Sequence, residues 1–111
     1  HQEAYAMVSA MLKARPEITA LFSAGYEMTP ACLKAARDMG LRVPADLSII
    51  SYVDSDIMPL LDPPVSALRM PFYEMGRRAA DVVVQNAPQK AKILLDCELM
   101  LRESTGAPAA R

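Results

Sequence analysis

The sequence is poor in the residues from which catalytic and metal sites are built. Its one histidine, His1, is the first residue, and its two cysteines, Cys32 and Cys97, have no metal-ligand spacing around them. The acidic residues form no recognisable acid–base pair, and the glycines are isolated rather than grouped in a phosphate-binding loop. We therefore predict that the chain is not an enzyme and that it uses no catalytic residue, cofactor or metal ion.

Strong charge of either sign is also missing. The 12 basic residues nearly balance the 13 acidic ones, which gives a net charge of -1, and no block of lysine or arginine stands out. Surfaces that bind nucleic acid are basic, because they neutralise phosphates. We therefore predict that this chain cannot read DNA by itself.

Two cysteines are too few for a disulfide scaffold. We expect Cys32 and Cys97 to be reduced and buried, as in a cytoplasmic protein, where cysteine packs as a small hydrophobic residue. No apolar run approaches the roughly 18 residues of a membrane-spanning helix, and no signal peptide opens the chain, so we predict no membrane contact. The chain starts at His1, inside a helical pattern, which we interpret as a piece of a longer polypeptide or a processed terminus.

What is present is a globular pattern of alternating helices and strands. The 111 residues allow one domain, and 52% of them are hydrophobic. Apolar residues at helical spacing predict helices over 3–14, 29–39 and 72–85. In the middle helix, Thr29 is the expected N-cap, Pro30 the first helical residue and Gly40 the left-handed stop.

Four apolar runs predict strands between and after these helices. The run Ile18–Ser23 is short and continuous, as in a strand covered on both faces, and 47–52 and 65–69 follow the same scheme. Ile93–Arg102 alternates with a period of two, which predicts a strand with one buried face at a sheet edge. The order predicts an α/β fold with a mainly parallel sheet flanked by helices. In such sheets ligands bind beyond the carboxyl ends of the strands, where the turns 24–29 and 53–56 would share one rim.

Several motifs in this order resemble one known family. The stretches "ALFSAGYEM", "GLRVPADLSIISYVD", "DPPVSALRMPFYEMGRRAA" and "CELMLRESTGAP" resemble the LacI family of bacterial transcription repressors. The resemblance runs from about Glu3 to Pro108 and covers the second half of the effector-binding region. It implies the C-terminal lobe of a periplasmic-binding-protein-like (type I) fold, formed by 1–70 and 91–108, with the helix 72–85 belonging to the other lobe.

The same resemblance implies how such a protein works. A helix-turn-helix headpiece that binds operator DNA would precede His1, and the regulator would act as a homodimer in the cytoplasm. A small effector in the cleft between two lobes would shift the population of lobe arrangements. Two other functions stay open at this point: a solute-binding protein of the same fold that works in transport, and a stand-alone α/β interaction module.

The residues implied to meet the effector depart from the family pattern. Relatives commonly place Asn-Asp after the first of these strands, where this chain has Gly25 and Tyr26, and an Asp where it has Val53. The implied effector-binding residues are Gly25, Tyr26, Val53, Asp54, Met70 and Phe72. Because a sugar hydroxyl that is buried unpaired costs about 1–3 kcal/mol, we expect a less hydroxylated, partly aromatic or apolar effector rather than an ordinary sugar.

Each of these residues also has a plainer interpretation. Tyr26 can be an exposed loop residue, Val53 a cap on the sheet core, Asp54 an N-cap, and Phe72 part of the core or of an interface.

Association is implied for two further segments. The implied dimer-interface residues are Pro30, Ala31, Leu33, Lys34, Pro59, Leu60 and Leu61, although Met58, Leu60 and Leu61 also fit an ordinary core. If the chain exists as a fragment, we expect the apolar stripe of the helix 72–85 to be covered by a second copy.

Overall fold

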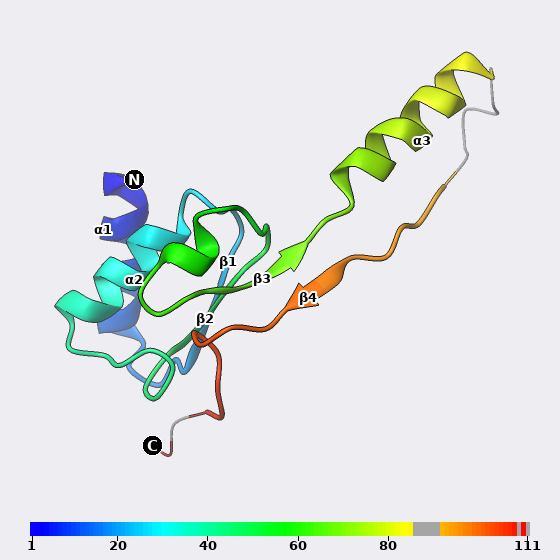
Figure 1. The fold of residues 1–111 in the computed structure, drawn as a ribbon. Coiled ribbons are helices and arrows are strands. Elements are labelled where there is room, and N and C mark those ends of the chain that lie inside the picture. The colour runs from blue at the N-terminus through cyan, green and yellow to red at the C-terminus, as the bar shows by residue number, and fades with distance from the viewer. Residues whose placement is uncertain (86–91, 109, 111) are drawn as a thin grey trace.

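A four-stranded sheet with two helices against it forms the body of the molecule, and a third helix projects from it (Figure 1). The computed structural model describes residues 1–85, 92–108 and 110. The elements in chain order are α1 Gln2–Ala14, β1 Ala20–Ser23, α2 Thr29–Asp38, β2 Ser48–Ser51, the 3-10 helix η1 Met58–Leu60, β3 Ser66–Arg69, α3 Phe72–Val84 and β4 Glu98–Met100.

The sheet has the order β1-β2-β3-β4, and its first three strands are parallel. Ser23 at the end of β1 stands opposite Ser51 at the end of β2, and β3 continues in the same direction. The strand β4 pairs with β3 in the antiparallel sense, with Arg69 opposite Glu98. The predicted α/β fold with a mainly parallel sheet is confirmed, and the carboxyl ends of β1, β2 and β3 lie on one rim.

The hydrophobic core lies between the sheet and the helices α1 and α2. Its buried members are Val8, Leu12, Leu21, Cys32, Leu33, Ala35, Ala36, Leu47, Ile49, Met58, Val65 and Ala67. The prediction that the strand ending at Ser23 is covered on both faces is wrong, because alternate residues of β1 are exposed. Phe22 is 59% exposed and Tyr52 43%. Their rings pack edge to face, 5.8 Å apart between centroids.

The ends of α2 agree only in part with the predicted cap residues. Thr29 is the first helical residue rather than the N-cap, which is Met28. Its buried hydroxyl donates to the Ser23 Oγ at 3.1 Å, so the side chain joins the helix to the end of β1 instead of capping. Gly40 does adopt the predicted left-handed conformation, with a φ of 71° that a side chain would strain.

The predicted strand Ile93–Arg102 is much shorter in the structure. Only Glu98–Met100 forms β4, and residue Cys97, which we expected to be buried, is exposed. The physical reason lies in β3, which ends at Arg69 and turns through Pro71 into α3, so the residues before 98 have no strand beside them. The buried state predicted for Cys32 is confirmed.

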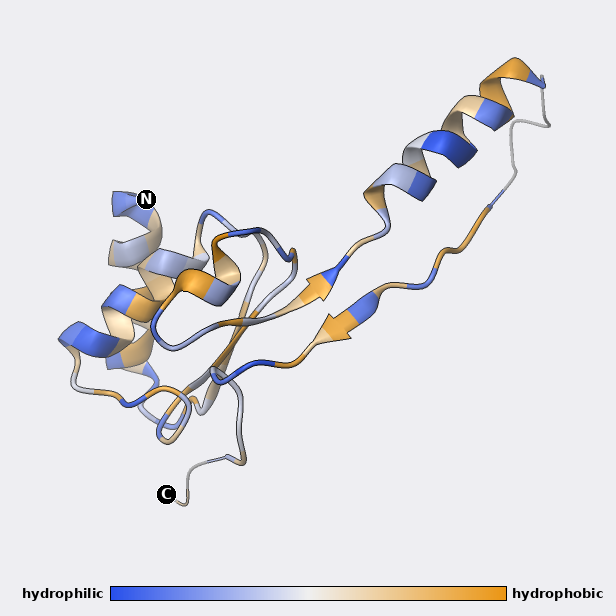
Figure 2. Cartoon of the chain, in the orientation of Figure 1, coloured by the Kyte–Doolittle hydropathy of each residue, from blue (hydrophilic) through white to orange (hydrophobic). Residues whose placement is uncertain are grey.

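The helix α3 and the segment that returns to β4 form an arm that extends away from the body (Figure 1). The Cα radius of gyration is 17.3 Å, against about 13 Å for a compact chain of this length. No residue of α3 is buried, and hydrophobic residues gather at its far end and along the returning segment (Figure 2). Residue 91, where the second part of the lobe is predicted to begin, lies outside the described residues.

None of the helices in the described part of the chain is long and apolar enough to span a membrane.

Candidate functional site

The rim at the carboxyl ends of β1, β2 and β3 is held together by backbone hydrogen bonds between successive turns. The Tyr52 N–H donates to the Ser23 carbonyl at 2.8 Å, which joins the turn after β2 to the end of β1. The Asp54 N–H donates to the Leu68 carbonyl, also at 2.8 Å, which joins the same turn to β3. Tyr26 and Val53 therefore follow adjacent strands at the same end of the sheet, as predicted.

Asp54 is the electrostatic centre of this rim. Its side chain is only 7% exposed and accepts hydrogen bonds from Arg102 at 2.8 and 3.1 Å. Arg69, at the end of β3, donates to the same carboxylate at 3.0 Å. Arg102 also donates to the Val65 carbonyl at 2.6 Å, so it ties the chain after β4 to the start of β3. The two guanidinium groups, Arg102 foremost, hold the pKa of Asp54 below its usual range, although desolvation acts in the opposite direction.

A pocket of about 300 Å³ opens beside this ion-pair cluster. It is lined by Asp54, Ser55, Asp56, Pro59, Arg69, Met70, Phe72 and Arg102. Three of the six predicted effector residues, namely Asp54, Met70 and Phe72, line it together. The alternative that Asp54 serves as an N-cap is wrong, since its carboxylate is engaged by arginines and the cap of η1 is Ile57. Phe72 is 57% exposed, which also excludes a core position within this chain.

The other three predicted effector residues lie on the same rim but outside this pocket. Tyr26 is 45% exposed and its hydroxyl donates to Glu27, as its plainer interpretation as a loop residue predicted. The carbonyl of Gly25 accepts a hydrogen bond from Ser23 at 2.9 Å, which closes the turn after β1. Val53 is half-buried, and its carbonyl accepts from the Ser51 hydroxyl at 2.8 Å.

Five further residues complete the pocket: Ser55, Asp56, Pro59, Arg69 and Arg102. Ser55 and Asp56 lie in the predicted rim turn 53–56, whereas Arg69 and Arg102 were not predicted as site residues. Arg69 could have been predicted from the sequence, because it is the last residue of a predicted strand and therefore lies at the ligand-binding end of the sheet. Arg102 is 48 residues from Asp54 along the chain and carries no local pattern that links the two. Their pairing depends on the antiparallel return of β4 along β3, which the sequence did not predict in that form.

The pocket offers both hydrogen-bond donors and acceptors, because the exposed carboxylate of Asp56 lines it beside the arginines. Both oxygens of Asp54 already accept from arginines, whereas Arg69 remains half-exposed and its second ion pair, with Glu98, is long at 3.8 Å. The Ser55 hydroxyl oxygen is buried and makes no hydrogen bond. Within the described ranges, no group of three or more His, Cys, Asp or Glu residues could hold a metal ion.

The predicted dimer-interface residues fall into two environments. Pro30, Leu33, Lys34 and Leu61 line one shallow pocket of about 240 Å³, so the two predicted segments share a surface. Ala31 and Leu33 are nevertheless 7% exposed, which makes them largely core residues of this chain. Met58 is fully buried, as the core alternative predicted, whereas Leu60 is 80% exposed.

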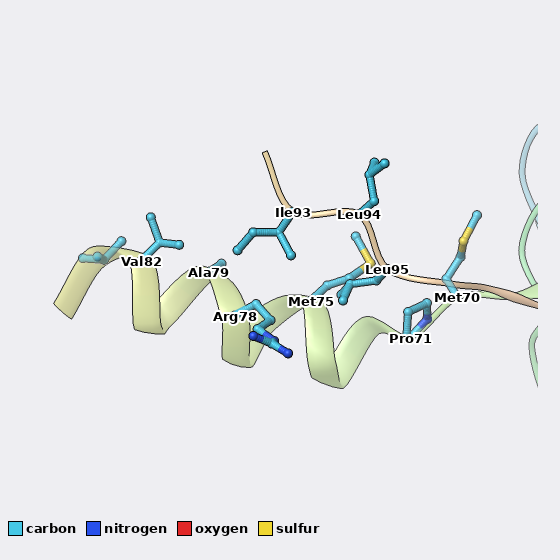
Figure 3. Close-up of a pocket in the computed structure, with 10 residues that line it drawn as sticks. Met70, Pro71, Met75, Arg78, Ala79, Val82, Ile93, Leu94 and Leu95 are labelled. Atoms are coloured by element: carbon cyan, nitrogen blue, oxygen red, sulfur yellow. The ribbon is translucent and has the colours of Figure 1, made fainter. Parts of the chain in front are cut away.

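A larger apolar groove of about 590 Å³ lies along the arm, between α3 and the returning segment (Figure 3). Ile93 and Leu95 lie over the helix, near Ala79 and Met75, while Leu94 points away. The groove is separate from the Asp54 pocket except at Met70, which lines both.

Comparison with known proteins identifies the family. Residues 1–105 match the model of the periplasmic binding protein-like domain. The HTH-type transcriptional repressor CytR of Escherichia coli is 37% identical over 93 residues, which cover 80% of this chain and 27% of that protein.

Solved structures give the same result. A LacI-family regulator from Bifidobacterium animalis is 33% identical and superposes with a TM-score of 0.85, over 98% of this chain and 41% of that one. The Lac repressor dimer bound to operator and the anti-inducer ONPF is 27% identical, with a TM-score of 0.82 over 94% of this chain and 37% of that one. The chain thus spans about a quarter of the curated repressor that it matches. It belongs to the periplasmic binding protein-like domain family, and within that family it corresponds to part of the effector-binding region of LacI-family transcriptional regulators.

Proposed function

We propose that the chain is the effector-sensing part of a LacI-type transcription regulator and that it binds a small molecule at the carboxyl ends of its parallel strands. The observation that carries the proposal is the pocket beside Asp54, which joins residues from the ends of β2 and β3 with Arg102 from the chain after β4. Ligands of open α/β sheets bind at this end of the strands. Relatives named as transcriptional regulators favour gene regulation over transport by a solute-binding protein, the alternative function.

Operator DNA would be bound by a headpiece outside this chain. The chain has a net charge of -1 and no basic block, so it lacks the charge that phosphate binding requires. The effector would act by favouring one arrangement of the two lobes, and this shift would change the affinity of the headpiece for DNA. Such a regulator is not an enzyme and works in the cytoplasm, where the operator is.

The effector is proposed to be less hydroxylated than a sugar. One solved relative, from Arthrobacter, is in complex with lactose, and the CelR relative is in complex with cellobiose. In this chain the positions implied to hold polar anchors are Gly25, Tyr26, Val53 and Met70. Gly25, Val53 and Met70 offer no side-chain hydrogen bond, and the Tyr26 hydroxyl already donates to Glu27. A sugar hydroxyl left unpaired there would cost about 1–3 kcal/mol, which disfavours a polyhydroxylated ligand.

The helix of the arm, α3, is proposed to belong to the second lobe. Residues 1–70 and 91–108 would form the C-terminal lobe, and the helix 72–85 would pack in the other one. This division is supported by α3, which buries none of its residues against the body. The surface shared by Pro30, Lys34 and Leu61, with the exposed Leu60 beside it, is proposed as part of a homodimer contact.

Calorimetry on the intact regulator tests the proposed function. A panel of sugars, nucleosides and aromatic acids is titrated into the wild type and into two variants, Phe72→Ala and Tyr73→Ala. Phe72 lines the pocket, whereas its neighbour Tyr73 is 86% exposed and does not. We expect at least one compound to bind and to lose about tenfold or more in affinity only in Phe72→Ala. Equal loss in both variants, or none in either, would reject the pocket as the effector site, and sub-millimolar binding of a simple sugar would reject the effector class.

A further inference from the structure

Arg69 lines the pocket, although it is not among the effector-binding residues predicted from the sequence. It is the last residue of β3, and its side chain is 52% exposed. One edge of its guanidinium group, Nε and Nη2, donates to the Asp54 carboxylate at 3.3 and 3.0 Å. A guanidinium group carries five N–H donors, so Nη1 and one hydrogen of Nη2 remain for another acceptor. Glu98, the nearest competitor, is 3.8 Å from Nη1 and itself 68% exposed.

The buried carboxylate of the pocket, Asp54, already has two arginine partners. Both oxygens of Asp54 accept from Arg102, and one also accepts from Arg69. Arg102 is equally committed, since it also donates to the Val65 carbonyl. A ligand hydroxyl would therefore compete with two guanidinium groups for this carboxylate, whereas a ligand acceptor would meet the edge of Arg69 that faces Glu98 across a long 3.8 Å ion pair.

The Ser55 hydroxyl adds a second donor. Its oxygen is buried, lies in the lining of the same pocket and has no hydrogen-bond partner. Buried polar groups in folded proteins nearly always have partners, so an unpaired hydroxyl in the lining of a pocket can pair with a group that enters it. A hydroxyl is also a flexible donor, because its hydrogen rotates toward the acceptor that arrives.

The rest of the lining defines the body of the ligand and its charge. Pro59, Met70 and Phe72 present apolar surface, and Phe72 offers a partly exposed ring. Asp54 and Asp56 balance Arg69 and Arg102 in formal charge, so the lining of the pocket is close to neutral. A planar carboxylate also matches the paired N–H donors along one guanidinium edge.

We propose that Arg69 is the specificity-determining residue of the pocket and binds the carboxylate of a small monocarboxylic acid whose apolar or aromatic body packs on Phe72. This inference rests on the proposed function, because it names the effector class of the same site. The Ser55 hydroxyl donates to the second oxygen of that carboxylate, and Asp54 holds the Arg69 side chain in place.

The test compares three probes by NMR on the full chain labelled with ¹⁵N: benzoate, its neutral isostere benzamide, and glucose. Arg69→Gln removes the charged guanidinium group, and Arg69→Lys keeps the positive charge without the paired N–H donors. Arg78→Gln is the matched control, because Arg78 is a half-exposed arginine that pairs with Glu74 on the arm and does not line this pocket. The backbone signals of residues at the pocket report binding, and the remaining signals report that each variant is folded.

We expect benzoate to shift the signals of the pocket residues and benzamide to bind about tenfold more weakly, with glucose weaker still. Arg69→Gln is expected to weaken benzoate about tenfold and to remove its advantage over benzamide, whereas Arg69→Lys keeps part of it and Arg78→Gln all of it.

Benzoate and benzamide binding equally in every variant would overturn the role of Arg69 and leave the proposed small-molecule site standing. Glucose binding above benzoate would overturn the acid class. If none of the three probes shifts pocket signals at about 10 mM, the carboxylate proposal is wrong. The proposed function is decided separately, by the calorimetric comparison of Phe72→Ala with Tyr73→Ala.

Discussion

Asp54 illustrates how one buried carboxylate organises a binding rim. A carboxylate that is 7% exposed would be strongly destabilised without partners, and Arg102 and Arg69 supply them. The pairing joins three parts of the chain that are distant in sequence: the turn after β2, the end of β3 and the segment after β4. The side chain therefore acts first as a structural link, and its effect on a ligand is to fix where Arg69 stands.

Asp54→Asn is expected to destabilise the fold by roughly 2–4 kcal/mol, because it leaves the largely buried Arg102 without its counter-charge. The measurement is the free energy of unfolding in urea at pH 7. Asp56→Asn is the matched control: Asp56 lines the same pocket but is exposed, so its change is expected to be small. An equal effect of the two substitutions would contradict the role assigned to Asp54.

The same carboxylate makes stability depend on acid pH. The pKa of Asp54 is lowered in the folded state, chiefly by Arg102 and also by Arg69, so the ionised form favours folding. This contribution is fully present above the ordinary aspartate pKa of about 3.9 and is lost as the pH falls through that value toward the lower folded-state pKa. We expect the stability difference between wild type and Asp54→Asn to shrink between pH 7 and pH 3. A difference that stays constant in urea titrations at both pH values would show that ionisation of Asp54 is irrelevant.

At the scale of elements, the segment after β4 joins two strands of the sheet through hydrogen bonds. The buried hydroxyl of Ser104 donates to the Ile49 carbonyl in β2 and accepts from the Ser66 N–H in β3. The backbone of the same residue accepts from the Ile49 N–H and donates to the Pro64 carbonyl. One residue of irregular structure thus connects two parallel strands near their amino ends.

Ser104→Ala is expected to cost about 1–3 kcal/mol in the free energy of unfolding, because the Ser66 N–H and the Ile49 carbonyl both lose a buried partner. Ser48→Ala serves as the comparison: its hydroxyl bonds to Gly106 in an exposed setting, where water can replace the contact. Thermal or urea unfolding of both variants measures the difference. A larger loss for Ser48→Ala than for Ser104→Ala would contradict this assignment.

How far the sequence predicted these elements depended on how local their causes are. The helix α2 and its Gly40 stop were predicted correctly, since both depend on neighbouring residues. The strand Ile93–Arg102 was overestimated, because alternation of apolar residues cannot reveal that β3 leaves the sheet at Arg69. In the candidate site, the rim and Phe72 were predicted, whereas the Asp54–Arg102 pair arises from tertiary folding alone.

For the whole molecule, the main physical problem is the arm. Its helix buries no residue, and Val83 and Val84 near the helix end are 76% and 81% exposed. Leu94, in the returning segment, is also 81% exposed. Exposed apolar surface of this extent marks a surface that another molecule or segment covers. In the proposed regulator the second lobe covers this apolar surface. In the isolated chain the surface must be covered by a different contact.

We therefore expect the isolated 111-residue chain to self-associate through α3, with exchange of arms between two copies as one form of the dimer. Light scattering at micromolar concentration measures the mass. Val83→Glu is expected to shift the population toward monomer, because it places a charge in the apolar groove, while Tyr73→Glu, on a residue outside that groove, changes little. A stable wild-type monomer on dilution would contradict the expectation.

The most direct test is a crystal structure of the intact regulator with its bound effector. We predict ligand density at the carboxyl ends of β2 and β3, with an acceptor group on the Nη1 edge of Arg69 and the apolar part against Phe72. Density at the amino ends of the strands, or a ligand held by sugar-type hydroxyl contacts to a carboxylate that Arg102 has released, would contradict it.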